Sequence, residues 1–125
     1  LIGANHKIVI EAFDDPMVAG VTCYISRAKT GGVTGSLGLA EDTSDASVAC
    51  RQVGDISFPA PIPKKDVVFK ESASILFKKV QVVRLVDSTK NVLVYMVYAD
   101  KLIDGSPKNS ITAVPVNRET KIPVR

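Results

Sequence analysis

Residues 75–86, ILFKKVQVVRLV, and residues 92–99, VLVYMVYA, are the two strongest strand candidates of the chain and decide its fold class. Valine dominates both segments, and branching at Cβ restricts χ1 and suits a pleated surface better than a helix. The residues between them, Asp87-Ser88-Thr89-Lys90-Asn91, are all polar, as expected for the loop of an antiparallel hairpin. Together these segments predict a β-hairpin.

A helix over Ser72–Val86 is the competing interpretation, because several of its apolar residues also recur near helical spacing. Val80, Val82 and Val83 would crowd a helix, and no N-cap with a following acidic first turn stands out. A strand is therefore the favoured prediction.

The rest of the chain continues the strand pattern, with 18 Val and 10 Ile against 7 Leu. The further strand candidates are His6–Phe13, Val21–Arg27, Ser47–Val53 with Asp55–Phe58, Asp66–Lys70 and Ser110–Val116. One short helix is expected at Leu39–Ala46, and the alternating prolines of segment 59–65 predict an extended connector. The sequence predicts an all-β fold, namely a single antiparallel sandwich or partly open barrel of six to eight strands with one short helix.

The length of 125 residues is that of one domain, so residues 1–125 are expected to form a single β domain. The longest uninterrupted apolar run, Val92–Ala99, is far shorter than a membrane-spanning helix requires. The net charge of +3 is small, and the few aromatic residues do not alternate with cations as stacking platforms would. We therefore expect neither a membrane span nor a nucleic-acid partner.

Charge is uneven along the chain. Residues 1–63 carry 4 basic and 7 acidic side chains, a net charge of −3, whereas residues 64–125 carry 12 and 6, a net charge of +6. If Lys78, Arg84 and Lys90 shared one face, an anionic lipid, peptidoglycan phosphate or an acidic partner would bind there. The alternative is that these cations only solvate strand edges and prevent edge-to-edge pairing.

The chain has two cysteines, Cys23 and Cys50, with 26 residues between them. From the residues alone, one disulfide and a pair of buried reduced thiols both remain open. Redox catalysis is not expected, because the sequence has no Cys-X-X-Cys spacing. A single histidine with two cysteines cannot complete a zinc site without carboxylates, and no phosphate-binding or dinucleotide fingerprint is present, so no metal or cofactor is predicted.

The segment Arg27–Asp45 is the first candidate binding region. It combines Arg27 and Lys29 at the end of a strand, four glycines, and then acidic residues that include Asp42. Glycine lets backbone N–H groups converge on an anion, and the two cations would strengthen such a site. The alternative is a surface loop in which Arg27 pairs with Asp42 or Asp45.

The second candidate is the pair Lys108 and Asn109, which follow the turn Asp104-Gly105-Ser106-Pro107. They would face a ligand from a loop on a rigid scaffold. The alternative is a tight turn in which proline and glycine set the backbone and the asparagine caps it locally.

Other titratable residues are not expected to act in catalysis. His6, the only histidine, opens a strand without a nucleophile or acid placed to work with it. Asp14 and Asp15 are neighbours in a turn, where adjacent carboxylates usually diverge into water. No catalytic residue is predicted.

Several long segments occur in an order that is characteristic of one family. They are His6–Pro16 (HKIVIEAFDDP), Val21–Gly32 (VTCYISRAKTGG), Gly38–Ala46 (GLAEDTSDA), Gln81–Arg84 (QVVR) and Gly105–Asn109 (GSPKN). Together they closely resemble the CreA family of small bacterial proteins, over nearly all of the chain.

The resemblance implies a secreted, periplasmic protein made with a signal peptide, so that Leu1-Ile2-Gly3 would follow a removed leader. Both cysteines fall on the family pattern, which in an oxidising compartment implies a Cys23–Cys50 disulfide. The chain departs from the family mainly at Pro59–Lys65, where a more polar segment is expected. The resemblance supplies no reaction, ligand or catalytic residue.

A secreted, disulfide-linked β domain without catalysis is the leading functional prediction. It would bind an envelope protein or a small polar or anionic ligand through Arg27, Lys29, Asp42, Lys108 and Asn109.

Two alternatives stay open. One is a small periplasmic hydrolase-like enzyme with a site near Lys29, Asp42 and Lys108. The other is a structural assembly protein that associates through an unpaired strand such as Val92–Ala99.

Overall fold

The computed structural model describes residues 3–4, 8–28, 46–72, 79–99 and 108–125. These residues form eight strands and contain no helix. The strands are β1 (Gly3–Ala4), β2 (Ile8–Asp14), β3 (Ala19–Ala28), β4 (Ala46–Ser57), β5 (Lys65–Ser72), β6 (Lys79–Asp87), β7 (Val92–Ala99) and β8 (Lys108–Pro115). The predicted all-β class is confirmed. Most of the segment predicted to be a short helix lies outside the described residues, and its last residue, Ala46, begins β4.

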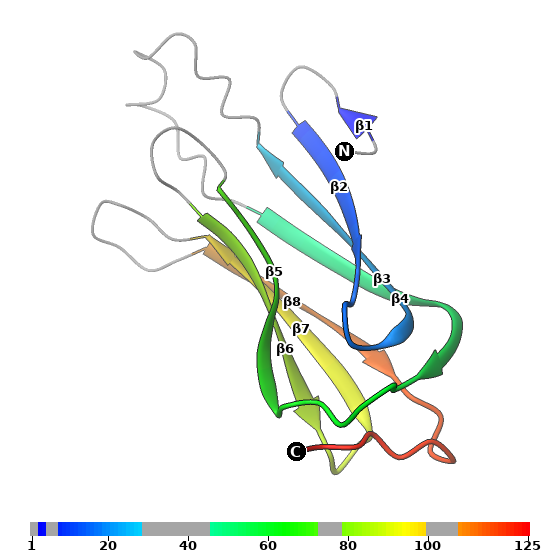
Figure 1. Cartoon of the computed structure of the whole chain (residues 1–125). Coiled ribbons are helices and arrows are strands. Elements are labelled where there is room, and N and C mark those ends of the chain that lie inside the picture. The colour runs from blue at the N-terminus through cyan, green and yellow to red at the C-terminus, as the bar shows by residue number, and fades with distance from the viewer. Residues whose placement is uncertain (1–2, 5–7, 29–45, 73–78, 100–107) are drawn as a thin grey trace, which may run out of the picture.

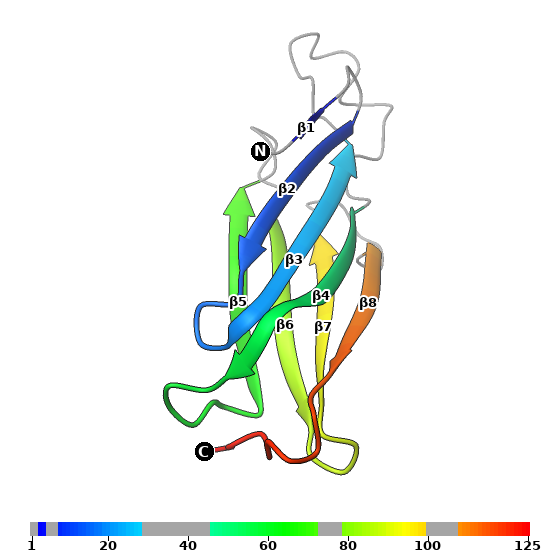
Figure 2. The same ribbon diagram turned by 90° about the vertical axis from the view of Figure 1, so that its right-hand side faces the viewer.

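The strands form two antiparallel sheets of four strands each, in the orders β1-β2-β3-β4 and β5-β6-β7-β8. The two sheets lie face to face as two layers, and neither closes into a barrel (Figures 1 and 2). Strand β7 pairs with β6 on one side and β8 on the other. The idea of an assembly interface on an unpaired Val92–Ala99 strand is therefore wrong.

One core fills the space between the sheets, because alternation along each strand sends every second side chain inward. In β7 the buried residues are Leu93, Tyr95, Val97 and Ala99. Residues of β3 and β4, such as Ile25 and Val48, belong to the same buried cluster. Full burial of each branched side chain stabilises the fold by roughly 1.5 to 3 kcal/mol.

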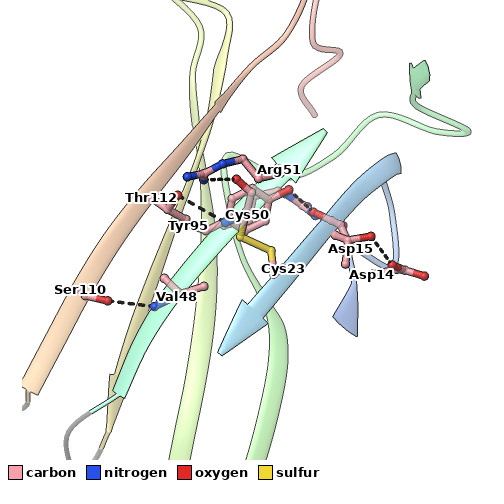
Figure 3. Close-up of a disulfide and its surroundings, with 11 residues drawn as sticks. Asp14, Asp15, Cys23, Val48, Cys50, Arg51, Tyr95, Ser110 and Thr112 are labelled. Carbon is pink, nitrogen blue, oxygen red and sulfur yellow. Dashed lines mark hydrogen bonds and ion pairs between the residues drawn. A yellow bond between two sulfur atoms is a disulfide. The ribbon is translucent and has the colours of Figure 1, made fainter. Parts of the chain in front are cut away.

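Strands β4 and β8 bring one side of the two sheets together through side-chain hydroxyls. The Val48 N–H donates to Ser110 Oγ at 3.2 Å, and the Cys50 N–H donates to Thr112 Oγ1 at 3.4 Å (Figure 3). These hydroxyls accept hydrogen bonds that a neighbouring backbone carbonyl would accept in a continuous sheet. The sheets are thus joined at this side without a shared backbone ladder.

Cys23 and Cys50 form a disulfide and face each other directly across β3 and β4. The S–S distance is 2.09 Å, and both residues are fully buried in the core (Figure 3). The Cys23–Cys50 bridge implied by the family resemblance is confirmed.

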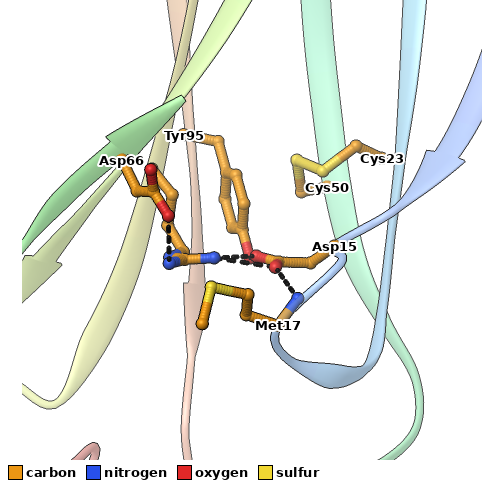
Figure 4. A network of polar contacts seen from close by, with 7 residues as sticks. Asp15, Met17, Cys23, Cys50, Asp66 and Tyr95 are labelled. Atoms are coloured by element: carbon orange, nitrogen blue, oxygen red, sulfur yellow. Dashed lines mark hydrogen bonds and ion pairs between the residues drawn. A yellow bond between two sulfur atoms is a disulfide. The ribbon is translucent and has the colours of Figure 1, made fainter. Parts of the chain in front are cut away.

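A buried ion pair also joins the two sheets. Arg84 of β6 is 0% exposed, and its Nη1 lies 2.7 Å from Oδ1 of Asp15, in the turn after β2. The Tyr95 hydroxyl donates to Oδ2 of the same carboxylate at 2.6 Å (Figure 4). The sequence-based expectations that Arg84 belongs to a surface cluster and that Asp15 points into water are both wrong, because each charge finds its partner only across the two sheets.

The predicted hairpin between β6 and β7 is present, and its last loop residue has an additional role. Asn91 has φ 60° and is buried. Its Nδ2 donates to the carbonyl oxygens of Val116, Asn117 and Thr120, and its Oδ1 accepts the Ile122 N–H. A single amide side chain therefore holds the C-terminal segment against the hairpin.

Strand β4 is one strand rather than two, with an irregularity where Gly20 of β3 faces its second half. Gly20 has φ +88°, and a Cβ there would lie 2.4 Å from the Asp55 carbonyl oxygen. The proline-rich connector that follows β4 is anchored at Ile62, which is fully buried and exchanges backbone hydrogen bonds with Pro123 and Arg125.

Candidate ligand-binding site

A surface pocket of about 380 Å³ lies where β3 and β4 approach the start of β8. We call it the β3–β4–β8 pocket. Its lining residues are Ile8, Ser26, Arg27, Ala46, Ser47, Lys108 and Asn109. The structure thus brings together three of the five predicted binding residues, Arg27, Lys108 and Asn109, from two candidate regions far apart in sequence.

The register of the sheet explains how the polar residues meet. Ser26 of β3 pairs with Ser47 of β4, and Arg27 pairs with Ala46. The Ser26 and Ser47 hydroxyls point to the outer face and lie 3.0 Å apart, within hydrogen-bond distance. Lys108 and Asn109 are the first residues of β8 and are exposed.

Arg27 is held by two carboxylates from different sheets. Its Nη2 lies 2.7 Å from Oε1 of Glu11 on β2 and 2.6 Å from Oε1 of Glu71 on β5. The alternative prediction paired Arg27 with Asp42 or Asp45, which lie outside the described residues. The Arg27 charge is therefore paired within the fold, and Lys108 is the second cation among the described lining residues.

The two carboxylates respond oppositely to this environment. Burial, together with the neighbouring Glu11 carboxyl, raises the pKa of Glu71. Burial also acts to raise the pKa of Glu11, but hydrogen bonds from Glu71 and Arg27 outweigh it and lower that pKa below its usual range. Glu11 is thus the member of the pair that keeps its negative charge to lower pH.

The lining offers hydrogen-bond groups and one ammonium rather than a reacting pair. The two serine hydroxyls and the Asn109 amide can each donate and accept, and Lys108 donates only. Ile8 contributes an apolar wall. This set of groups can bind a small polar or anionic molecule, and the described lining residues include no carboxylate, thiol or imidazole.

The other predicted site residues, Lys29 and Asp42, lie outside the described residues, as does His6. Within the described ranges, no three histidine, cysteine or acidic side chains lie together as a metal site would require. Among the residues that the structure describes, there is no helix long and apolar enough to cross a membrane.

Sequence reasoning missed Ser26, Ser47, Glu11 and Glu71. The outward position of Ser26 follows from the alternation of its strand, and that pattern was a usable signal. The pairing of Glu71 with Arg27 joins residues 44 positions apart, so no local sequence pattern could predict it.

Comparison with known proteins agrees with the sequence resemblance. The profile of the family described as CreA protein matches residues 1–119. The proteins named CreA from Escherichia coli K12, O6:H1 and O157:H7 are each 58% identical to this chain over 120 residues, covering 93% of this chain and 76% of the relative. No solved structure matches the chain. With this coverage and identity, the chain belongs to the CreA family.

Proposed function

We propose that this chain is the folded part of an exported protein that binds a small anionic or polar ligand in the β3–β4–β8 pocket. The observation that carries the proposal is the meeting of Lys108 and Asn109 with Ser26 and Ser47 in one pocket. A volume of about 380 Å³ lies within the range of small-molecule sites.

The charge of the site favours an anion. Arg27 and Lys108 both line the pocket and both carry a positive charge, and Lys108 is exposed. Serine hydroxyls and an asparagine amide beside an ammonium are the groups that bind phosphate or carboxylate oxygens by charge-assisted hydrogen bonds.

The buried disulfide supports an extracytoplasmic location, because disulfides persist in oxidising compartments and are rare in the cytosol. We propose on this ground that the protein is periplasmic. Osmotic-shock fractionation of cells expressing the full-length precursor, followed by alkylation without reductant, tests the location. Two freely alkylated cysteines in a cytoplasmic fraction would contradict it.

Ligand binding is tested by titrating isotopically labelled protein with inorganic phosphate, citrate and a hexose phosphate. We expect amide chemical shifts of Ser26, Ser47 and Asn109 to change, and Lys108→Gln to weaken binding about tenfold, because it removes a charge-assisted hydrogen bond. Lys121→Gln, an exposed lysine outside the lining, is the matched control.

Unchanged shifts around the pocket with all three probes would refute the pocket as an anion site. The alternative of a hydrolase acting through Lys29, Asp42 and Lys108 stays a prediction, and no described contact favours it.

A further inference from the structure

The outer face of the second sheet carries an apolar row that crosses all four strands. Val67 of β5 pairs with Val83 of β6, Val83 with Met96 of β7, and Met96 with Ile111 of β8. The ends of the row are open, with Val67 48% and Ile111 68% exposed, whereas Val83 between them is only 3% exposed. No described element covers this face, and the next row adds Leu85, Val94 and Ala113.

Two lysines flank the row on the edge strand. Lys65 and Lys70 lie on the same face of β5 as Val67, in register with Leu85 and Gln81, and both are exposed. Neither lysine forms an ion pair with a described carboxylate. We call the surface formed by Lys65, Val67, Lys70, Met96 and Ile111 the lysine-flanked face.

The carboxylates of β5 do not offset these charges on the outside, because they point inward. Asp66 lies 3.7 Å from Arg84 Nη2, and Glu71 lies 2.6 Å from Arg27 Nη2. Among the described outward positions of this sheet, the only carboxylate is that of Asp87, the next outward residue after Leu85, which pairs with Lys65; Asp87 accepts the Lys90 N–H. The lysine-flanked face is therefore apolar at its centre and positive at its edge.

Size and charge decide what this surface can bind. Four strands spaced about 4.8 Å apart and about 25 Å long present roughly 400 to 500 Å², about half of what each partner buries in a stable protein complex. A second copy docked through the same face would place like charges together. A membrane surface needs less area, because the two apolar side chains and the two lysines add their contributions against anionic lipid headgroups.

We propose that the lysine-flanked face binds the surface of an anionic phospholipid bilayer. Lys65 and Lys70 contact the phosphate groups, while Val67 and Ile111 enter the boundary between headgroups and acyl chains. The contact is peripheral and uses none of the residues that line the β3–β4–β8 pocket, although Asn109 of that lining lies on the same outward face of β8 as Ile111. The proposal stands whether or not that pocket binds a ligand.

The test is sedimentation of the oxidised chain with vesicles of equimolar phosphatidylglycerol and phosphatidylethanolamine, and with vesicles of phosphatidylcholine. We expect binding to the anionic vesicles alone, with loss of binding in high salt. The double variant Lys65→Gln, Lys70→Gln should bind roughly thirtyfold more weakly. The double variant Val67→Ser, Ile111→Ser should also bind more weakly, and because both side chains are exposed, its unfolding should stay close to that of the wild type.

The matched control is Arg118→Gln, Lys121→Gln, which removes the same charge from exposed residues of the C-terminal segment. Its affinity should stay within about threefold of the wild type. Equal weakening by both double charge variants would overturn the proposal, because it would show that vesicle binding depends on the net charge of the protein and not on the position of Lys65 and Lys70. Failure of the wild-type chain to sediment with either kind of vesicle would also overturn it and would leave an acidic protein surface as the occupant.

Discussion

Arg84 places a positive charge in a mainly apolar core, where Asp15 contacts it directly and Asp66 lies 3.7 Å from its Nη2. Nη1 of Arg84 lies 2.7 Å and 3.0 Å from the two oxygens of Asp15, which also accept the Met17 N–H and the Tyr95 hydroxyl. Burial and the adjacent Asp15 charge raise the pKa of Tyr95, so its phenol stays protonated and continues to donate. Three separate segments therefore depend on this one cluster.

Removal of one member of the buried pair should be costly. We expect Arg84→Met to lower the free energy of unfolding by about 3 to 5 kcal/mol, because it leaves Asp15 buried without its countercharge. Asp15→Asn should cost a similar amount, and the double variant should cost less than the sum of the two. Urea unfolding of the four proteins measures this coupling. Simple additivity would show that the two side chains act independently.

Gly20 offers a second residue-scale prediction with a built-in control. Gly20→Ala should destabilise the protein by about 2 kcal/mol or more, because φ is +88° and the new Cβ would overlap the Asp55 carbonyl. Gly54→Ala should change the unfolding free energy little, since its nearest neighbouring atom is 4.0 Å from the added Cβ. Equal effects in thermal unfolding would contradict the reason given.

At the scale of elements, the two sides of the paired sheets are held in different ways. Hydroxyls of β8 accept N–H groups of β4 on one side. On the side where β2 faces β5, Phe13 stacks on Phe69 with ring centroids 4.6 Å apart, and Arg27 bridges Glu11 and Glu71. Both joints use side chains, so each sheet keeps its own backbone ladder.

The Arg27 bridge predicts a pH dependence of stability. The folded-state pKa of Glu11 is lowered, so its contribution is present above about pH 4.5 and is lost as the pH falls through the lowered value. Glu11→Gln should therefore destabilise the protein by about 1 to 2 kcal/mol at neutral pH, and the difference from the wild type should vanish in acid.

Glu71→Gln is the comparison for this experiment. The pKa of Glu71 is raised, so its carboxyl favours folding below about pH 4.5, and this contribution is lost as the pH rises through the folded value. Its replacement at neutral pH should cost less than that of Glu11. Chemical unfolding measured across the acid range reports both variants, and parallel curves for the wild type and Glu11→Gln would contradict the assignment.

At the scale of the whole molecule, the fold presents two candidate surfaces that share no residue and adjoin on β8. The β3–β4–β8 pocket joins the first sheet to the start of β8, whereas the lysine-flanked face covers the outside of the second sheet. Lys108→Gln and the Lys65→Gln, Lys70→Gln variant therefore test different properties. The disulfide lies in the core and belongs to neither surface.

The disulfide should stabilise the whole molecule rather than either surface. We expect Cys23→Ala, Cys50→Ala to lower the free energy of unfolding by about 3 to 4 kcal/mol, because the bridge restricts the unfolded chain across 27 positions. Urea unfolding of the oxidised wild type and the variant measures the loss. A variant as stable as the wild type would show that the β3–β4 ladder alone suffices.

Much of the fold was predictable because strand formation leaves a local pattern. The bounds of β7 agree with the predicted segment 92–99, and the polar run before it forms the hairpin loop. The candidate site was predictable only in its parts: Lys108 and Asn109 were identified from their turn, and Arg27 from the end of its strand. Their meeting in one pocket was not predictable, because it depends on how β8 lies beside β4.

The sequence by itself determined the β class and the main strands. Through the segments that resemble the CreA family, it also indicated which cysteines form the disulfide. Those properties depend on alternation and branching within a few residues, which any local stretch displays. Only the tertiary structure decided that Arg84 and Asp15 are buried together and that Lys65 and Lys70 share an outer face with an apolar row. Burial and surface charge depend on contacts between segments that are far apart in the sequence. Local patterns of residues do not specify those contacts.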